Sequence, residues 1–274
     1  MGSSLSKFFR PPSTIHPREL VEKDPPADPQ PPTEVNVVVT GFGVWSKNVP
    51  WPPPPFNTSW LIADALPRVI FRQNKRNIRI ITYPKPISGT WTGVRELIPQ
   101  IWDGQKDFFG LPVDPKKGSD DRFQVHAVLH CGCLDQPGEA FRLERNAFKE
   151  EYTLPDNDGL LPSEDDKTGG GDWINFPVML STDINTDTVL AAVKAKISGE
   201  PLVLSDDPNR YTCGWMYWVS LAELYKRQEK LRALFMHTPI EGKSEDIEIG
   251  VKIASIVIQS MVEDLEERKL IGLF

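Results

Sequence analysis

The stretch Val35-Asn36-Val37-Val38-Val39-Thr40, which runs into Gly41-Phe42-Gly43, decides the fold of this chain. Its β-branched residues favour an extended strand, and the glycines that follow favour a turn. Similar strand patterns recur downstream, at residues 78–83, 125–130, 202–204 and 233–237. Helical patterns lie among them, at residues 58–66, 89–102, 186–197 and 244–267, and a further helix is predicted to start at or beside Cys213. Such alternation is typical of an α/β fold with a mainly parallel sheet and helices on both faces.

The helix predicted at residues 244–267 has the clearest periodicity. Its apolar residues recur at alternating intervals of four and three, namely Ile247, Val251, Ala254, Ile258, Met261 and Leu265. This spacing places them along one side of a helix, as expected for a helix that packs against a hydrophobic core.

The first 34 residues differ in composition from the rest of the chain. They contain eight prolines and few apolar side chains, so neither a helix nor a sheet ladder is expected there. We predict a disordered, proline-rich tail over residues 1–34 and a single domain over residues 35–274. Within the domain, residues 104–122 are predicted to form an inserted loop, and residues 156–172 a mobile acidic loop.

Composition narrows the classes of function. With 39% hydrophobic and 25% charged residues, the chain is that of a soluble globular protein. The formal net charge of −7 and the absence of a run of basic residues argue against a nucleic-acid partner. No apolar stretch approaches the roughly 18 residues of a membrane span, and no secretory signal is visible. Three cysteines do not form a disulfide framework, so a reducing, cytoplasmic location is predicted.

The extreme N-terminus carries a separate signal. Residues 1–7, Met-Gly-Ser-Ser-Leu-Ser-Lys, match the pattern for myristoylation of Gly2, and a chance match is the alternative. A single acyl chain gives only marginal membrane binding, and Lys7 and Arg10 add little positive charge. Membrane contact is therefore expected only if Gly2 is acylated, and then as a weak association through the N-terminus.

Cys213 and His237 are the first candidates for catalysis. Each is predicted at a junction between a strand and a helix or loop, where α/β folds place their reacting groups. A thiol and an imidazole in such positions suggest a nucleophile and its base. The alternative for either residue alone is structural: a small buried cysteine, or a histidine that ends a strand.

Two other sequence patterns give weaker evidence of function. The turn at residues 41–43 lacks the third glycine of a dinucleotide fingerprint, and prolines follow where the phosphate-binding helix would begin. We interpret this loop as presenting Phe42 and Trp45 to a pocket, with two core rings as the alternative. The run His130-Cys131-Gly132-Cys133 lacks the paired knuckles of a structural zinc site, so core packing is predicted and no metal is expected.

Six short motifs, in order, make the chain resemble the pyroglutamyl peptidase I family, cysteine peptidases that remove an N-terminal pyroglutamate. The match runs from about residue 35 to residue 267, and its motifs are Thr40-Gly41-Phe42, Val128-Leu129-His130-Cys131-Gly132, Leu143-Glu144-Arg145-Asn146-Ala147, Asp156-Asn157-Asp158-Gly159, Tyr211-Thr212-Cys213 and Phe235-Met236-His237-Thr238-Pro239. Each motif alone is only weakly specific, but all six occur in the same order as in the family, which makes the resemblance specific.

The resemblance implies a three-layer α/β/α sandwich with a mixed, mainly parallel sheet, and a reaction without metal or cofactor. It implies that Cys213 is the nucleophile, His237 the base and later the acid, and Glu144 the carboxylate that orients His237. A thiol in the first turn of a helix agrees with this, because the positive end of the helix dipole favours the thiolate.

The expected substrates are peptides with an N-terminal pyroglutamate, whose lactam ring suits an apolar slot. By resemblance, Phe42 lines this slot and Trp45 takes the place of a second phenylalanine. Cys133 begins the segment that replaces a glycine-rich ring-binding wall, and Thr153 stands where bacterial members carry an arginine. Because of these departures, a catalytically inactive relative that binds peptide ends is the alternative function.

Overall fold

The computed structural model describes residues 34–134, 140–199, 201–240 and 244–271. Gly2 and, apart from Glu34, the whole predicted tail lie outside these described residues. The first strand, β1, starts at Val35, as the sequence predicts. No helix within the described ranges is both long enough and apolar enough to cross a bilayer.

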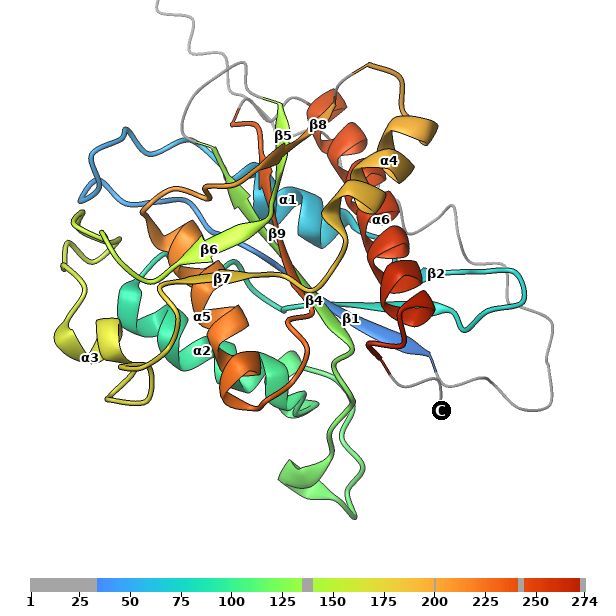
Figure 1. Ribbon diagram of the computed structural model, residues 1–274, viewed down its shortest axis with the longest axis horizontal. Coiled ribbons are helices and arrows are strands. Elements are labelled where there is room, and N and C mark those ends of the chain that lie inside the picture. The colour runs from blue at the N-terminus through green and yellow to red at the C-terminus, as the bar shows by residue number, and fades with distance from the viewer. Residues whose placement is uncertain (1–33, 135–139, 200, 241–243, 272–274) are drawn as a thin grey trace, which may run out of the picture.

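A seven-stranded sheet forms the centre of the domain, in the order β2-β3-β1-β4-β9-β5-β8 (Figure 1). Its strands are β1 (Val35–Gly41), β2 (Val69–Ile70), β3 (Ile78–Thr82), β4 (Ala127–Cys133), β5 (Phe141–Glu144), β8 (Leu202–Ser205) and β9 (Ala233–Thr238). Two neighbouring pairs, β2 with β3 and β5 with β9, are antiparallel, and the other pairs are parallel. The predicted α/β fold with a mixed, mainly parallel sheet is confirmed. A separate antiparallel pair joins β6 (Asn146–Phe148) to β7 (Met179–Ser181).

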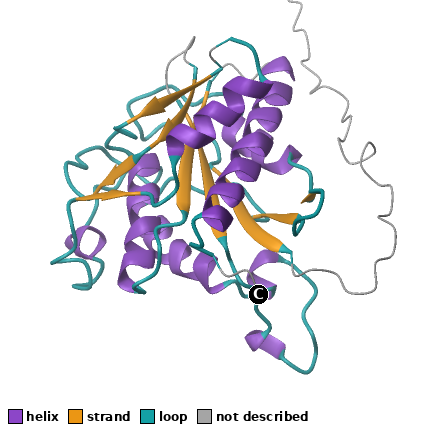
Figure 2. Ribbon diagram, turned by 45° about the vertical axis from the view of Figure 1, so that its right-hand side comes forward, coloured by secondary structure: helices purple, strands orange, loops and turns teal. Residues whose placement is uncertain are grey.

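Helices cover both faces of this sheet (Figure 2). The α-helices of the described residues are α1 (Thr58–Ala65), α2 (Trp91–Asp103), α3 (Glu164–Thr168), α4 (Thr186–Lys196), α5 (Thr212–Lys226) and α6 (Ser244–Glu267). One core cluster joins the sheet to α1, α4 and α6, and a second joins it to α2 and α5. The sheet with its two helical layers is therefore a three-layer sandwich.

Side-chain alternation along the strands assigns each residue to one of these layers. In β4, Ala127, Leu129 and Cys131 belong to the cluster of α1, α4 and α6, whereas Val128 belongs to that of α2 and α5. In β9, Met236 faces the first cluster and Phe235 the second. His237 follows the parity of Phe235, and Gly132 that of Val128, so both face the layer that contains α5.

The structure corrects two sequence predictions. The strand predicted to end at His130 continues to Cys133, so residues 131–133 are paired with β9. The acidic stretch 156–172 is not only a loop: α3 forms within it, with Ser163 and Asp166 in a capping box. The buried Asp156 also accepts hydrogen bonds from the backbone N–H groups of Trp91 and Leu160. Asp166 thus caps its own helix α3, and Asp156 accepts from the first residue of the distant helix α2, uses that charge content alone does not reveal.

Residues 104–122 form the predicted loop insertion, with two short 3₁₀ turns, Asp107–Phe109 and Gly118–Asp120. Figure 1 shows this green segment projecting away from the sheet. An isolated bridge between Gln105 and Arg122 joins its two ends. The insertion therefore leaves the sheet order undisturbed.

Candidate active site

Cys213 is the second residue of α5, and 8% of it is exposed. The residue before the helix, Tyr211, makes no side-chain cap to it. The first N–H groups of any α-helix have no partner within the helix, so those of α5 place positive partial charge at the helix end that carries Cys213. None of the three cysteines is in a disulfide. The sequence thus placed Cys213 correctly at a helix start.

Gly132 sets the position of the cysteine sulfur. A Cβ atom on Gly132 would lie only 2.8 Å from Cys213 Sγ and 2.6 Å from Cζ of Phe235. The sulfur therefore rests directly against the β4 backbone, in space that any side chain at this position would occupy. Gly132 is also the register partner of His237 in the parallel pair β4–β9. Cys213 Sγ thus lies beside the strand position next to His237.

His237 and Glu144 form a buried pair on β9 and β5. His237 Nδ1 lies 2.7 Å from Glu144 Oε1, and both side chains are 1% exposed. A carboxylate only accepts hydrogen bonds, so Nδ1 carries the hydrogen and the Nε2 lone pair remains available. Within the described residues, His237 Nε2 is buried and has no hydrogen-bond partner. The antiparallel pairing of β5 with β9 brings the two residues together across 93 positions of sequence.

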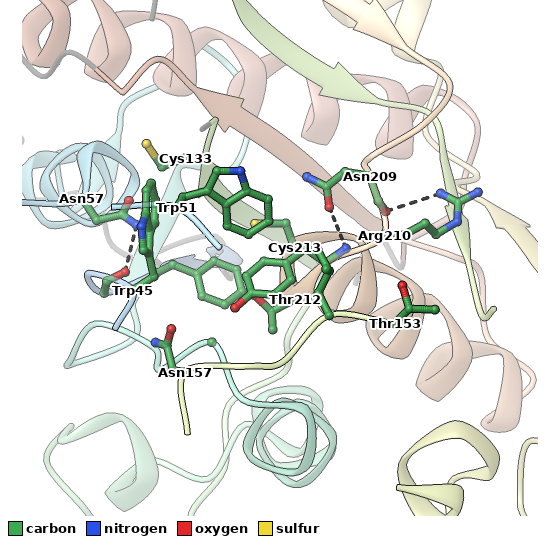
Figure 3. A pocket seen from close by; sticks show the side chains of 15 residues that line it. Trp45, Trp51, Asn57, Cys133, Thr153, Asn157, Asn209, Arg210, Thr212 and Cys213 are labelled. Carbon is green, nitrogen blue, oxygen red and sulfur yellow. Dashed lines mark hydrogen bonds between the residues drawn. The ribbon is translucent and has the colours of Figure 1, made fainter. Parts of the chain in front are cut away.

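A cavity of about 320 Å³ opens beside Cys213 (Figure 3). Its volume is at the low end of the roughly 300–1,000 Å³ of typical small-molecule sites, so a small ligand fits best. All three predicted binding residues, Phe42, Trp45 and Cys133, line it together with Cys213. His237 and Glu144 are not among the residues that line the cavity, and both are buried.

The three predicted lining residues differ in their contacts. Phe42 is 4% exposed and belongs to the α2–α5 cluster, so it is both a core ring and a cavity wall. Trp45 is partly exposed and donates its indole N–H to the carbonyl of Pro52 at 3.0 Å. Cys133 accepts a hydrogen bond from Thr58 at 3.3 Å and lies at the α1 end of the cavity. The cavity therefore has an aromatic wall and a sulfur-containing end.

Sequence reasoning did not single out several other lining residues, among them Trp51, Asn157, Arg210 and Tyr211. Trp51 lies within a run of prolines that has no helical or strand period and was interpreted only as a loop. Tyr211 was quoted only as part of the cysteine motif. Its hydroxyl donates to the carbonyl of Pro155 at 3.2 Å, and burial raises its pKa above the ordinary tyrosine value. The one sequence signal that could have pointed to this part of the cavity is a tryptophan, Trp51, within a run of prolines.

In the run at residues 130–133, His130 and Cys131 are part of the core, whereas Cys133 also lines the cavity. His130 hydrogen-bonds through Nδ1 to Thr40 at 2.8 Å and through Nε2 to Ser220 at 2.9 Å. Complete burial lowers the pKa of His130 to about 3, and burial raises the pKa of Cys131 to about 12. In the part of the chain that the structure describes, no group of three metal-binding side chains occurs.

Comparison with known proteins gives relatives of a single kind, although no family model matches. The chain is 28% identical to the pyrrolidone-carboxylate peptidase of Clavibacter michiganensis over 158 residues, 55% of this chain and 70% of that protein. It is 22% identical to human pyroglutamyl-peptidase 1 over 231 residues, 84% of this chain and 91% of that protein.

Solved structures of similar fold are also pyrrolidone carboxyl peptidases. A variant of the Pyrococcus furiosus pyrrolidone carboxyl peptidase covers 84% of this chain and 99% of its own, with a TM-score of 0.59 and 16% identity. The Thermococcus litoralis pyrrolidone carboxyl peptidase covers 85% of this chain and 96% of its own, with a TM-score of 0.58 and 15% identity. At such identities these matches show the fold alone.

Fold and site together define a class: an α/β/α sandwich in which a cysteine, a histidine and a carboxylate approach one end of the sheet. Within that class, the sequence relatives confirm the resemblance drawn from the motifs. The chain is a relative of the pyroglutamyl peptidase I family.

Proposed function

We propose that the protein is a cysteine peptidase that hydrolyses the amide bond after an N-terminal pyroglutamyl residue through a thioester acyl-enzyme. One observation carries this proposal: the His237–Glu144 pair lies beside Gly132, against which Cys213 Sγ rests, at the edge of a small aromatic cavity. The names of the sequence relatives, pyroglutamyl and pyrrolidone-carboxylate peptidases, support the same substrate.

Acylation starts at Cys213. The sulfur attacks the pyroglutamyl carbonyl carbon while His237 Nε2 accepts the thiol proton. The tetrahedral intermediate then collapses with cleavage of the C–N bond, and the imidazolium gives its proton to the departing amine. The products of this half are a pyroglutamyl thioester on Cys213 and a peptide shortened by one residue.

Deacylation uses the same groups in reverse. His237 Nε2 takes a proton from water as the water oxygen attacks the thioester carbonyl, and the thiol leaves with that proton. Glu144 keeps His237 in the tautomer with hydrogen on Nδ1 and stabilises the imidazolium in both halves. The uncapped N–H groups at the start of α5 are suited to hold the oxyanion, at about 3 kcal/mol for each donor.

The cavity suits the lactam. A five-membered lactam is flat and uncharged, and the faces of Phe42 and Trp45 offer it an apolar slot. Cys133 closes one end of this slot in place of a glycine-rich turn. An N-terminal glutaminyl or prolyl residue carries an ionised amine, whereas a pyroglutamyl residue does not. An aromatic slot of this kind would remove water from that amine without giving it a partner.

The test is hydrolysis of three amides of one fluorophore: pyroglutamyl, prolyl and glutaminyl. Wild-type protein is expected to cleave the pyroglutamyl amide at least about a hundredfold better than the other two, because only the lactam enters the slot uncharged. Cys213→Ala is expected to cleave none of them. Equal turnover of the pyroglutamyl amide by wild type and Cys213→Ala would refute the proposal.

Alkylation by iodoacetamide separates this function from the inactive, peptide-binding alternative. An activated thiolate at Cys213 is expected to react below pH 7 faster than glutathione does, and His237→Ala to remove that advantage. Labelling of Cys213 no faster than of an ordinary thiol, with no hydrolysis of any amide, would favour the binding function instead.

A further inference from the structure

Trp51 is a wall of the cavity that the motifs of the chain do not include. It lies in the loop between β1 and α1, is flanked by Pro50 and Pro52, and is partly exposed. Figure 3 places Cys133, Asn57 and Trp45 at one end of the cavity and Asn209, Arg210 and Thr153 at the other. Trp51 and Cys213 lie between these ends, so the indole covers the middle of the cavity.

The loop that carries Trp51 is held at several points. The Trp45 indole N–H donates to the carbonyl of Pro52, the residue directly after Trp51, at 3.0 Å. Ser46 Oγ and Asn48 Nδ2 both donate to the carbonyl of Asn157, at 2.6 Å and 3.0 Å. Pro52 to Pro55 follow in sequence, and each fixes its own φ angle. The indole is therefore positioned before any ligand arrives, which lowers the entropic cost of binding.

Tyr211 provides the surface on which Trp51 rests. The two rings meet edge to face, with centroids 5.1 Å apart and planes at 71°. Tyr211 is itself fixed by its hydrogen bond to Pro155 and by an edge contact with Trp91 at 5.7 Å. It also lies two residues before Cys213. A rigid aromatic wall thus runs from the core to the outer side of the cavity, next to the sulfur.

From this arrangement we infer that Trp51 is the outer wall of the acyl slot and determines the ring size that the slot accepts. The inference rests on the proposed function and extends it to the selection of the acyl group. With Trp51 in place, the slot fits a five-membered lactam and rejects a six-membered one. Without the indole, the middle of the slot is open to solvent and the added methylene has room.

The test compares two substrates that differ by one methylene: the amides of 5-oxoproline and of 6-oxopiperidine-2-carboxylic acid with the same fluorophore. A closed apolar pocket discriminates one methylene by roughly 10- to 200-fold in kcat/KM, and wild-type protein is expected within that range. Trp51→Ala is expected to lower this ratio to below about threefold and to raise the KM of the five-membered substrate by about tenfold, with kcat little changed. Trp51→Phe is expected to restore most of the discrimination.

Phe71→Ala is the matched control, since Phe71 is an aromatic residue that is 49% exposed and does not line the cavity. Its ratio is expected to equal that of wild type. An unchanged ratio and KM in Trp51→Ala, while wild type cleaves the five-membered substrate selectively, would overturn the inference and leave the proposed function intact. A wild-type protein that cleaves both rings equally well would overturn it too.

A second measurement keeps the inference testable if hydrolysis is absent. Calorimetric titration of Cys213→Ala with the two unreactive carboxamides, pyroglutamide and its six-membered homologue, reports the slot without chemistry. The five-membered ligand is expected to bind at least about tenfold more tightly than its homologue. The additional change Trp51→Ala is expected to remove the difference. Binding of neither carboxamide would overturn the inference, and failure of hydrolysis alone would refute only the proposed function.

Discussion

The two faces of the central sheet pack against different kinds of side chain. The layer of α1, α4 and α6 packs aliphatic side chains such as Val257, Ile258 and Leu265 against the sheet. The layer of α2 and α5 packs large aromatic rings, including Trp91, Trp215 and Trp218, and also contains Cys213. Strand alternation directs His237 and Gly132 to this second layer.

The difference shows where the molecule places its chemistry. Both faces bury hydrogen-bonded polar groups, such as Asp264 on α6, but in the aromatic face these groups lie among large rings. His130, between Thr40 and Ser220, is the clearest of these, and the Trp102 indole donates to the same Ser220. Rings at fixed distances form rigid walls. The cavity and the catalytic candidates lie where this face reaches the carboxyl ends of β1, β4 and β9, the end at which α/β sheets bind their ligands.

The largest expected effect is the loss of the base on the aromatic face. His237→Ala should lower kcat/KM for the pyroglutamyl amide by a factor on the order of 10⁴ to 10⁶, because the thiol loses its proton acceptor. The melting temperature should fall as well, because the variant leaves the buried Glu144 carboxylate without its partner at 2.7 Å. Steady-state kinetics and a thermal melt measure the two. A variant that keeps a tenth of the activity would contradict the assigned role.

The next effect tests the aliphatic face. Ile258→Ala removes a fully buried side chain on α6 and should lower the free energy of unfolding by about 2–5 kcal/mol. The KM for the pyroglutamyl amide should stay the same, because Ile258 lies in the aliphatic cluster and is not among the residues that line the cavity. Val251→Ala on the same helix, where the side chain is only partly buried, is the control and should cost less. A large change in KM with unchanged stability in Ile258→Ala would contradict the assignment of separate roles to the two faces.

A smaller effect is expected at the contact between sheet and sulfur. Gly132→Ala places a methyl group where Cys213 Sγ lies, and displacement of a reacting atom by about 1 Å costs roughly a hundredfold in rate. The loss should appear in kcat and in the rate of iodoacetamide labelling, with some loss of stability from overpacking. Unchanged kcat in this variant would show that the sulfur is not held against β4.

The smallest effect concerns pH. The pKa of His130 is about 3 in the folded state, against an ordinary value of 6.5, so between these values only the unfolded chain binds the proton. The folded protein should therefore lose about 1.4 kcal/mol for each pH unit below 6.5 through this residue. In His130→Gln that loss is absent, so the stability gap between wild type and variant should narrow as pH falls. Urea unfolding at pH 7, 6 and 5 measures it, and a constant gap would mean that His130 takes up its proton in the fold.

How much of this could be read from the sequence depends on the range of the interaction. The strand at residues 35–40 and the helix at 244–267 were predicted because their periodicity is local. Cys213 was also predicted at or beside a helix start, and it is the second residue of α5. The strand β5 was missed, because Phe141–Glu144 is short and carries two charged residues.

The site depends on contacts that periodicity does not encode. The pairing of His237 with Glu144 requires the antiparallel insertion of β5 beside β9, and only the resemblance to a family pointed to it. The close approach of Gly132 to Cys213 is a matter of tertiary packing. Trp51 was missed because a run of prolines has no period, although that same run fixes the loop.

The central claim is that Cys213 carries the acyl group during the reaction. The direct measurement is acid quench of wild-type protein within its first turnover of an activated pyroglutamyl ester, followed by digestion and mass spectrometry. The account predicts that the peptide containing Cys213 gains the mass of one pyroglutamyl group and that peptides containing Cys131 or Cys133 do not. An adduct on either of those cysteines, or turnover of the ester without any adduct under conditions that trap thioesters, would contradict it.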